Sequence, residues 1–427
     1  MNIENMLNNE MGISPVVYET IKNAENRAKK YFEVAEEVAE YNQLKVLNAF
    51  RKFRISYSHF GETSGYGYDD LGRDTLDEVF AEIFHAESAM VRHNIVSGTQ
   101  AIALCLYAVL RPGDTLASLV GSPYDTMEEV IGIRGDEGTG SLKDFGVNYD
   151  QVDLLPDGTV DYSGIENMLK SKKIKAVLIQ RSKGYDWRKS LDIDEIGNII
   201  KMVKTVSPET VCIVDNCYGE FVEKREPTDV GADLVVGSLI KNAGGSLAQS
   251  GGYVAGKEKY VELVGYRFTA PGLGKHVGAS LGFNKSLYQG LFMAPHIVCQ
   301  SIKTAILCAC AFEDMGYDVC PKSDEIRTDI IQAVKLGTPE KVIKFCQGIQ
   351  SGSPVDSHVS PVPWAMPGYE DEVIMAAGAF VQGASIELSA DAPICEPYNV
   401  YMQGGIVYEA SKLGIMEAVA RVMKEGE

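Results

Sequence analysis

The sequence predicts an α/β protein with a large domain built on a mainly parallel sheet and a smaller α+β domain at the C-terminus. Between about residues 60 and 290, short continuous apolar segments alternate with helical segments. Such apolar runs are typical of parallel strands that helices cover on both faces. After about residue 300 this alternation stops, and 427 residues are enough for two domains.

The chain begins with a predicted helix and a predicted loop. Residues 14–52 are rich in charged residues and alanine, and their apolar residues recur every three or four positions. A stretch rich in Gly and Tyr follows over residues 59–73 and predicts a loop. Residues 74–87 begin with a capping pattern and carry an apolar stripe, which predicts a helix. We therefore expect an N-terminal helical segment over residues 1–58.

The large domain is expected over residues 59–295 and the small domain over residues 296–427. Residues 99–110 predict a helix of the large domain. The small domain is expected to contain strands over 373–381 and 385–390 and to end in a helix. Six apolar segments predict strands of the large domain, namely 88–96, 114–120, 175–180, 210–215, 232–238 and 251–256.

Composition narrows the possible functions. The net charge of −19 argues against nucleic acid or an anionic membrane as the main partner, because binding phosphate groups requires clustered Lys and Arg. No apolar run approaches the ~20 residues that a membrane-spanning helix needs, and the N-terminus has no signal peptide pattern. Nine cysteines in a long chain indicate reduced thiols. We expect a cytoplasmic enzyme, and the six scattered histidines give no metal-ligand spacing.

Lys241 follows the predicted strand 232–238 by three residues, where a buried segment ends. Ligand sites of parallel α/β sheets lie at the carboxyl ends of the strands, so the side chain is expected to enter a crevice. Withdrawal from water lowers the pKa of a lysine, and a neutral amine can attack an aldehyde. The sequence therefore predicts that Lys241 holds an aldehyde cofactor as a Schiff base.

Pyridoxal 5'-phosphate (PLP) is the obvious aldehyde, and it requires an acid at its ring nitrogen, a phosphate site and a surface for its ring. Asp215 ends a predicted strand and can keep the ring nitrogen protonated. Tyr124 follows the strand 114–120 and can stack on the ring. The predicted phosphate site is the strand-to-helix junction formed by Gly98, Thr99 and Gln100, with the hydroxyl of Ser238 added.

Each of these residues also has a structural interpretation. A lysine at a strand end is often a solvated edge residue, and an Asp-Asn pair or a Ser-Gly-Thr turn often only caps the next helix. A tyrosine beside a proline, as at Tyr124, is often only a packed loop residue. The order and spacing of all the elements together favour the cofactor site.

The same residues resemble the fold type I PLP-dependent enzymes of cysteine and methionine metabolism, which include the cystathionine lyases and methionine γ-lyase. The chain is most similar to the branch described as methionine γ-lyase-like, cystathionine β-lyase family or aluminium resistance proteins. The resemblance implies an aspartate aminotransferase-like large domain and a PLP cofactor. The matching positions are Ser97-Gly98-Thr99, Tyr124, Asp215-Asn216 and Ser238 to Lys241.

Two positions depart from the pattern of these enzymes. They have a Tyr-x-Arg pair that contacts the phosphate of a neighbouring subunit, whereas here Tyr68 matches the tyrosine and Asp70 the arginine. Arg73 or Arg181 is a candidate replacement for that arginine. A C-terminal arginine that holds the substrate carboxylate has no counterpart, so Arg267 and Arg181 are the candidates, because the planar guanidinium can grip two oxygens. The alternative for Arg267 is a surface or subunit contact.

The function implied is a carbon–sulfur lyase acting on methionine, cystathionine or cysteine by α,β- or α,γ-elimination. In this mechanism Lys241 takes the α-proton as general base, Asp215 keeps the ring charged, and Tyr124 or Tyr68 assists a second proton transfer. Another PLP-dependent reaction, such as transamination or aldolase-type cleavage, and a non-catalytic PLP carrier are the alternatives. A homodimer or homotetramer is expected, with Tyr68 reaching the neighbouring site.

Overall fold

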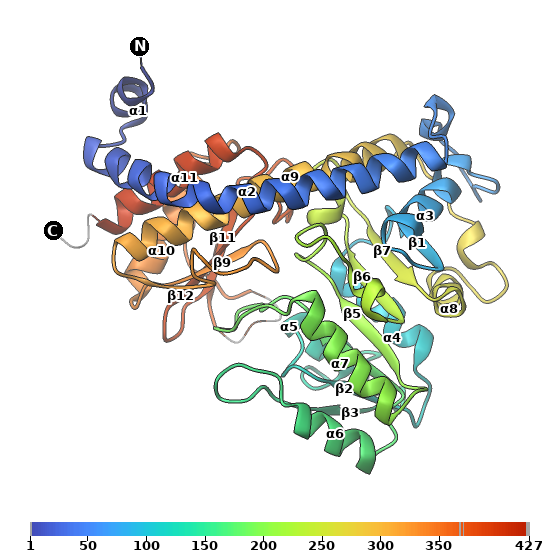
Figure 1. Ribbon diagram of the computed structural model, residues 1–427. Helices are drawn as coiled ribbons and strands as arrows, with labels where there is room; N and C mark the ends of the chain where they lie inside the picture. The colour runs from blue at the N-terminus through green and yellow to red at the C-terminus, as the bar shows by residue number, and fades with distance from the viewer. Residues whose placement is uncertain (1, 367–368, 370, 424–427) are drawn as a thin grey trace. The chain divides into compact units, whose positions relative to one another are not determined.

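The structure is a computed structural model that describes residues 2–366, 369 and 371–423 (Figure 1). The chain divides into two units. The larger consists of residues 42–184 and 190–293, and the smaller of residues 1–41, 185–189 and 294–427. The predicted domain boundary at 295/296 lies two residues from the division at 293/294. Residues 1–41, however, group with the C-terminal part of the chain and do not form a segment of their own.

A seven-stranded sheet forms the centre of the larger unit, in the order β1-β7-β6-β5-β4-β2-β3. The five strands from β6 to β3 in this order are parallel to their neighbours, whereas β7 pairs antiparallel with both β6 and β1. The expected mainly parallel sheet is therefore confirmed. The strands are β1 (Ser88–Arg92), β2 (Thr115–Ser118), β3 (Asn148–Gln151), β4 (Ala176–Gln180), β5 (Val211–Asp215), β6 (Leu234–Ser238) and β7 (Gly252–Gly256).

Alternate residues of the strands bury their side chains on one face of this sheet. In β5 and β6 these are Val211, Ile213, Leu234 and Val236, which lie in one hydrophobic cluster with the buried residues of α4. The period of two is the pattern expected of a pleated strand. The helices of the larger unit are α3 (Leu71–Ile83), α4 (Gly98–Val109), α5 (Asp125–Ile131), α6 (Tyr162–Ser171), α7 (Ile193–Val206) and α8 (Glu258–Phe268).

Helix α4 positions the candidate site, because its N-terminus lies just after β1. Ser97 caps the helix, and its side-chain oxygen accepts a hydrogen bond from the Gln100 N–H at 3.0 Å. Seven of its twelve residues are buried, so the helix is fixed along most of its length. Short 3₁₀ helices occupy four further segments, η1 (Tyr57–Phe60), η2 (Pro227–Val230), η3 (Asn242–Gly244) and η4 (Gly274–His276).

The smaller unit contains a five-stranded antiparallel sheet in the order β10-β11-β12-β9-β8. Its strands are β8 (Asp318–Cys320), β9 (Ile331–Lys335), β10 (Val373–Ala376), β11 (Ser389–Pro393) and β12 (Asn399–Gln403). Helices α1 (Ile3–Met11), α10 (Pro339–Ser351) and α11 (Tyr408–Met423) also belong to this unit. Helices α10 and α11 approach closely, since a methyl group at Gly348 would lie 2.4 Å from the Ala418 Cα.

Two long helices, α2 (Pro15–Lys52) and α9 (Asn284–Asp314), each contribute residues to both units. In the smaller unit they lie side by side, because Arg27 pairs with Glu313 at 2.8 Å and Lys303 with Glu36 at 2.9 Å. By length and composition α9 is apolar enough to cross a membrane, contrary to the expectation from sequence, but 72% of its most apolar window is buried inside the protein.

The structure adds strands that the apolar pattern did not predict. β3 has the sequence NYDQ, whose polar side chains suit an edge strand but give no apolar run. β8, β9 and β12 are further strands that the apolar pattern did not predict. The predicted strand 373–381 is shorter in the structure, where β10 ends at Ala376, and the predicted strand 385–390 begins only at Ser389.

Candidate active site

Lys241 follows β6 by three residues and directly precedes the short helix η3. All five residues of β6 are buried, whereas Lys241 is only partly buried. Its Nζ lies 4.0 Å from the centroid of the Tyr218 ring, which is a cation–π distance. The side chain is therefore held against an aromatic ring at the carboxyl end of the strand.

The electrostatic environment of Lys241 differs from the expectation. Burial by itself lowers the pKa of the amine, but the neighbouring Cys217, Tyr218, Asp215 and Glu220 raise it, and the net effect places it above its ordinary value. The expected lowering of the lysine pKa by burial is therefore wrong, because the neighbouring acidic groups outweigh the loss of water.

Asp215 is the last residue of β5, the strand beside β6. It pairs with Gln180 of β4 on one side and with Val236 of β6 on the other. Its side chain is 9% exposed, and Oδ1 accepts a hydrogen bond from the Cys217 N–H at 3.1 Å. The carboxylate is thus fixed at the same sheet edge from which Lys241 emerges.

The predicted phosphate turn lies beside the end of β6. A methyl group at Gly98 would lie 3.7 Å from the Ser238 Cβ and 3.3 Å from the Cys217 Sγ. The first N–H groups of a helix have no partner within the helix, and together with the helix dipole they favour an anion. The turn therefore presents its N–H groups near Ser238.

Two side chains of this turn make contacts within the protein. The Thr99 hydroxyl lies 2.7 Å from that of Thr126, and the Gln100 side-chain oxygen accepts a hydrogen bond from the Val96 N–H at 2.7 Å. These contacts fix the turn. The Gln100 backbone N–H already donates to the Ser97 Oγ, so a contribution to an anion comes most directly from the backbone N–H of Thr99 or from the side-chain amide nitrogen of Gln100.

Ser238 supplies the observation that tests whether the site fits a phosphate. Its side chain is 1% exposed, and among the described residues its Oγ has no hydrogen-bond partner. A buried hydroxyl without a partner costs about 1–3 kcal/mol. A phosphate oxygen between the α4 turn and Ser238 would remove this cost, so the residues present fit the cofactor that the sequence indicates.

Tyr124 precedes α5 and belongs to the same edge of the sheet. Its N–H donates to the Gln180 Oε1 at 2.8 Å, and Gln180 is the residue paired with Asp215. A methyl group at Gly184 would lie 3.9 Å from the Tyr124 Cδ2. The structure thus links Tyr124 to the strand that stands beside Asp215.

Arg181 is placed differently from the expectation. Its side chain is fully buried, and NH1 donates to the Asn216 Oδ1 at 2.8 Å and to the Gly219 carbonyl at 3.0 Å. NH2 forms an ion pair with Glu223 at 2.7 Å. These contacts direct its charge into the protein, so its position does not support a role in holding a phosphate or a substrate carboxylate.

Arg267 lies on the exposed side of α8, with its guanidinium carbon 5.0 Å from the centroid of the Tyr107 ring. Tyr107 is nine residues after Gly98 in α4, which corresponds to about 14 Å along the helix axis. Within one chain Arg267 is therefore not brought to the phosphate turn, and its position supports the surface alternative.

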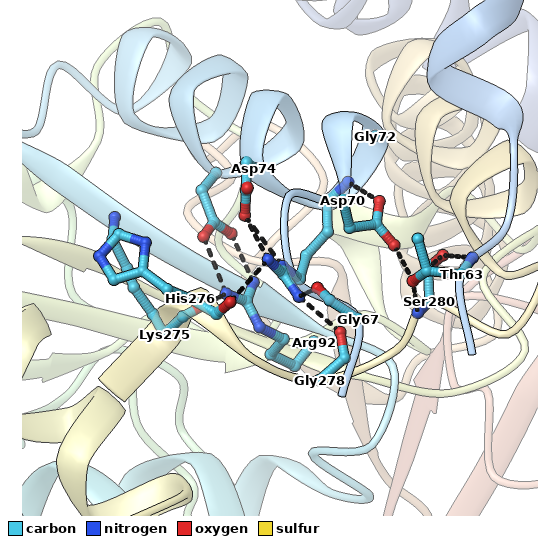
Figure 2. Close-up of polar contacts among 12 residues, drawn as sticks. Thr63, Gly67, Asp70, Gly72, Asp74, Arg92, Lys275, His276, Gly278 and Ser280 are labelled. Atoms are coloured by element: carbon cyan, nitrogen blue, oxygen red, sulfur yellow. Dashed lines mark hydrogen bonds and ion pairs between the residues drawn. The ribbon is translucent and has the colours of Figure 1, made fainter. Parts of the chain in front are cut away.

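Arg73 is fully engaged inside the larger unit, so its contacts do not support a role as the missing phosphate-binding arginine. Its side chain is buried, and NH1 donates at 2.6 Å to the carbonyls of both Gly67 and Gly278. Figure 2 shows these two backbone segments brought together at Gly67 and Gly278. Asp70 instead accepts the Arg73 N–H as a helix cap, at 2.9 Å.

Tyr68 lies in the loop that Arg73 fixes, and its side chain is 59% exposed. Its ring centroid is 5.7 Å from that of Tyr66, which is 74% exposed. The loop therefore presents two neighbouring aromatic rings to the surroundings of this chain.

Three residues near Lys241 were missed from the sequence. Tyr218 contacts the amine, and it adopts a positive φ of 72°, which is uncommon for a residue other than glycine. Glu220 and Tyr253 are fully buried and hydrogen-bonded to each other at 2.9 Å. The sequence signal for Glu220 was an acidic residue in the apolar-flanked stretch CYGEF. A glutamate is seldom buried without a partner, so this position indicated a contact with another side chain.

The chain is similar to known proteins over most of its length. A family model for methionine gamma-lyase matches residues 17–423. The uncharacterized protein YnbB of Bacillus subtilis is 52% identical over 390 residues, which cover 91% of this chain and 92% of that protein. A carbon-sulfur lyase involved in aluminum resistance from Clostridium novyi NT has a TM-score of 0.95 and 49% identity, and the match covers 99% of both chains.

A more distant structure shows the fold alone. The pyridoxal-5'-phosphate dependent protein YhfS of Escherichia coli is 16% identical, with a TM-score of 0.61 over 90% of this chain and 97% of that one. The fold and the site together define a fold type I PLP-dependent enzyme architecture. The chain belongs to the methionine gamma-lyase family, whose members use PLP as cofactor.

Proposed function

We propose that this protein is a PLP-dependent carbon–sulfur lyase that acts on methionine, cystathionine or cysteine. The observation that carries the proposal is the buried Ser238 hydroxyl without a protein partner, beside the α4 turn and on the strand that leads to Lys241. Membership of the methionine gamma-lyase family supports the same chemistry.

Each residue of the site has its own role in the proposed reaction. The bound cofactor supplies an electron-withdrawing ring that makes the α-proton of an amino acid more acidic. Lys241 would hold the cofactor and, once released, take this proton at Nζ. Asp215 would hold a proton at the ring nitrogen, and the α4 turn with Ser238 would bind the phosphate. Tyr124 would orient the ring and exclude water on one side.

Lys241 is tested first. Reduction of the protein with borohydride in the presence of PLP should leave the cofactor mass on the peptide that contains Lys241, because reduction makes the lysine–cofactor bond permanent. A Lys241→Ala variant should carry no label on this peptide. Labelling at another lysine, with none at residue 241, would refute the assignment.

The reaction is tested with L-methionine, L-cystathionine and L-cysteine under the same conditions. A lyase releases ammonia, a thiol or sulfide, and a 2-oxo acid from its substrate. Elimination at the β-carbon of cystathionine yields pyruvate, whereas elimination at the γ-carbon of methionine yields 2-oxobutyrate. Labelled Lys241 without any 2-oxo acid from the three amino acids would favour the carrier alternative, and amino transfer to an added 2-oxo acid would favour an aminotransferase.

We also propose that the active protein is at least a homodimer in which Tyr68 of one chain reaches the site of the other. The exposed pair of Tyr66 and Tyr68, on a loop fixed by the buried Arg73, supports this assembly.

A cytoplasmic location is proposed from the nine cysteines, all within the described residues, which form no disulfide.

A further inference from the structure

The ring of Tyr218 lies against the amine of the predicted cofactor lysine. The Lys241 Nζ is 4.0 Å from the centroid of this ring. An ammonium group at such a distance is attracted by the negative face of the ring, and the attraction is stronger where water is excluded. Both side chains are partly buried. The contact therefore favours the charged form of the amine at this place.

The backbone of Tyr218 adopts an unfavourable conformation. Tyr218 is the third residue of a turn that is closed by a hydrogen bond from the Gly219 N–H to the Asn216 carbonyl at 2.9 Å. Its φ is 72°, a left-handed conformation for which glycine or asparagine is usual. Such conformations persist where the surrounding structure holds them, and they cluster at functional sites. An aromatic residue at 218 thus needs a reason beyond the turn itself, and the contact with Lys241 supplies one.

Arg181 holds this turn from the interior of the larger unit. Its NH1 donates to the Asn216 Oδ1 at 2.8 Å and to the Gly219 carbonyl at 3.0 Å. A methyl group at Gly219 would lie 2.5 Å from both the Cδ and the NH1 of Arg181, so only glycine leaves room for the guanidinium. The buried arginine fixes both ends of the turn and thereby the place of the residue at 218.

The segment that carries the lysine is bonded to the same loop. The Asn242 Nδ2 donates to the Glu220 carbonyl at 3.1 Å, and Asn242 follows Lys241 directly. Both Asn242 and Glu220 are fully buried. A lysine side chain is long and flexible, so an amine without a partner would sample many positions. Here the backbone is anchored at residue 220 and the amine rests on the ring at residue 218.

We propose that Tyr218 is a positioning residue whose ring face is the docking site of the Lys241 ammonium whenever the lysine is not bonded to the cofactor. The proposal rests on the proposed role of Lys241. The amine is positively charged once it has taken the α-proton of an amino acid, and this is the form that the ring face stabilises. Docking also keeps the amine at the carboxyl end of β6 between turnovers.

Other groups act on the same amine. Burial lowers the pKa of Lys241, and four neighbouring acidic groups raise it, namely Cys217, Tyr218, Asp215 and Glu220. Three of these groups favour the charged amine independently of the ring. The test must therefore change the ring and leave the other three in place.

The test uses cofactor-free protein, so its outcome does not depend on lyase activity. Acetylation of Lys241 by acetic anhydride is followed at several pH values by competitive labelling and peptide mass analysis, because only the neutral amine reacts. In Tyr218→Leu the rate at a fixed pH below the midpoint should rise about three- to thirtyfold, since the cation–π attraction is lost. Tyr218→Phe keeps the ring, so its rate should stay within about twofold of the unaltered protein.

A ring of similar shape with a less negative face separates the effect of charge from that of access. Position 218 is occupied by phenylalanine in one protein and by 3,4,5-trifluorophenylalanine in the other. Lys241 should react at least about twofold faster beside the fluorinated ring, because fluorine withdraws electron density from the ring face. This pair also serves if Tyr218→Leu fails to fold. Equal rates beside the two rings, or a Tyr218→Phe protein that reacts as fast as Tyr218→Leu, would overturn the proposal.

Tyr18→Leu is the matched control, because the Tyr18 ring of α2 also lies near a lysine, with the Lys22 Nζ 5.4 Å from its centroid. Loss of this ring should leave the rate at Lys241 unchanged. A rise as large as in Tyr218→Leu would count against a specific contact and so against the proposal.

Borohydride trapping with PLP separates this proposal from the proposed function. Suppose that the acetylation rates follow the expected order but that PLP leaves no label on Lys241. The proposed lyase function would then be contradicted, while docking of the Lys241 ammonium on Tyr218 would still be supported.

Discussion

At the scale of single residues, the hydroxyl groups of two serines in the site have different roles. The Ser97 oxygen accepts the Gln100 N–H at 3.0 Å and serves as a helix cap. The Ser238 oxygen is buried without a partner. The first serine stabilises the fold by itself, whereas the second gains its partner only when a ligand binds.

Replacing Ser238 by alanine should weaken PLP binding about tenfold, which corresponds to about 1.4 kcal/mol for one lost hydrogen bond. The cofactor-free protein should become more stable by about 1 kcal/mol, because the substitution removes a buried hydroxyl that has no protein partner. Titration followed by absorbance measures the affinity, and urea unfolding measures the stability.

Pyridoxal without its phosphate is the control ligand for this variant. Its affinity should be the same with Ser238 and with alanine, because the missing contact is to the phosphate. An equal loss of affinity for PLP and pyridoxal would contradict the assignment of Ser238 to the phosphate site.

At the scale of elements, Arg73 and Arg92 connect α3 and β1 with the segment after α8. Arg92 pairs with Asp77 of α3 at 2.7 Å and donates to the Lys275 carbonyl at 2.6 Å, while Arg73 donates to the His276 carbonyl at 3.1 Å (Figure 2). Both arginines are buried. They satisfy backbone carbonyls that no regular strand pairs, so they determine the shape of the loop that carries Tyr68.

Replacing Arg73 by methionine should lower the free energy of unfolding by about 3 kcal/mol, because buried carbonyls and Asp74 lose their donor. Urea unfolding measures the change. Lys52→Met is the control, since the exposed ion pair of Lys52 with Glu82 at 2.6 Å should contribute less than about 1 kcal/mol. Equal stability of the two variants would show that Arg73 does not hold this loop.

At the scale of the whole molecule, the three arginines considered from the sequence do not meet at Lys241, since Arg73 and Arg181 are bonded elsewhere and Arg267 lies over Tyr107. Tyr68 is exposed, and its ring lies beside that of Tyr66. Completion of the site by a second copy is consistent with both observations.

Subunit mixing tests this completion. Tyr68→Ala and Lys241→Ala homodimers should each be inactive or nearly so. When they are unfolded together and refolded, a mixed dimer has one site with both residues intact, so about a quarter of the unaltered activity should return. Titration should likewise find one tight PLP site in each mixed dimer. No recovery on mixing, with both proteins folded and dimeric, would contradict a shared site.

The sequence by itself determined the strands that carry the site. β5 and β6 are continuous apolar runs ending in Asp215 and Ser238, and the covered parallel sheet follows from such runs because both faces must be buried. The positions of Lys241 and of the Ser97 cap follow from local chain order, as does the long helix from residue 15 to 52.

Only the tertiary structure decided which charges meet. From the sequence, Arg181 was a candidate for binding the substrate carboxylate. In the structure its guanidinium instead bonds to Asn216 and Glu223 in the interior. Glu220 meets Tyr253, thirty-three residues away in the chain, and residues 1–41 group with the C-terminal part. Periodicity describes only neighbours along the chain, whereas pairing of buried charges depends on contacts between distant segments, so the proton affinity of Lys241 could not be predicted from its position.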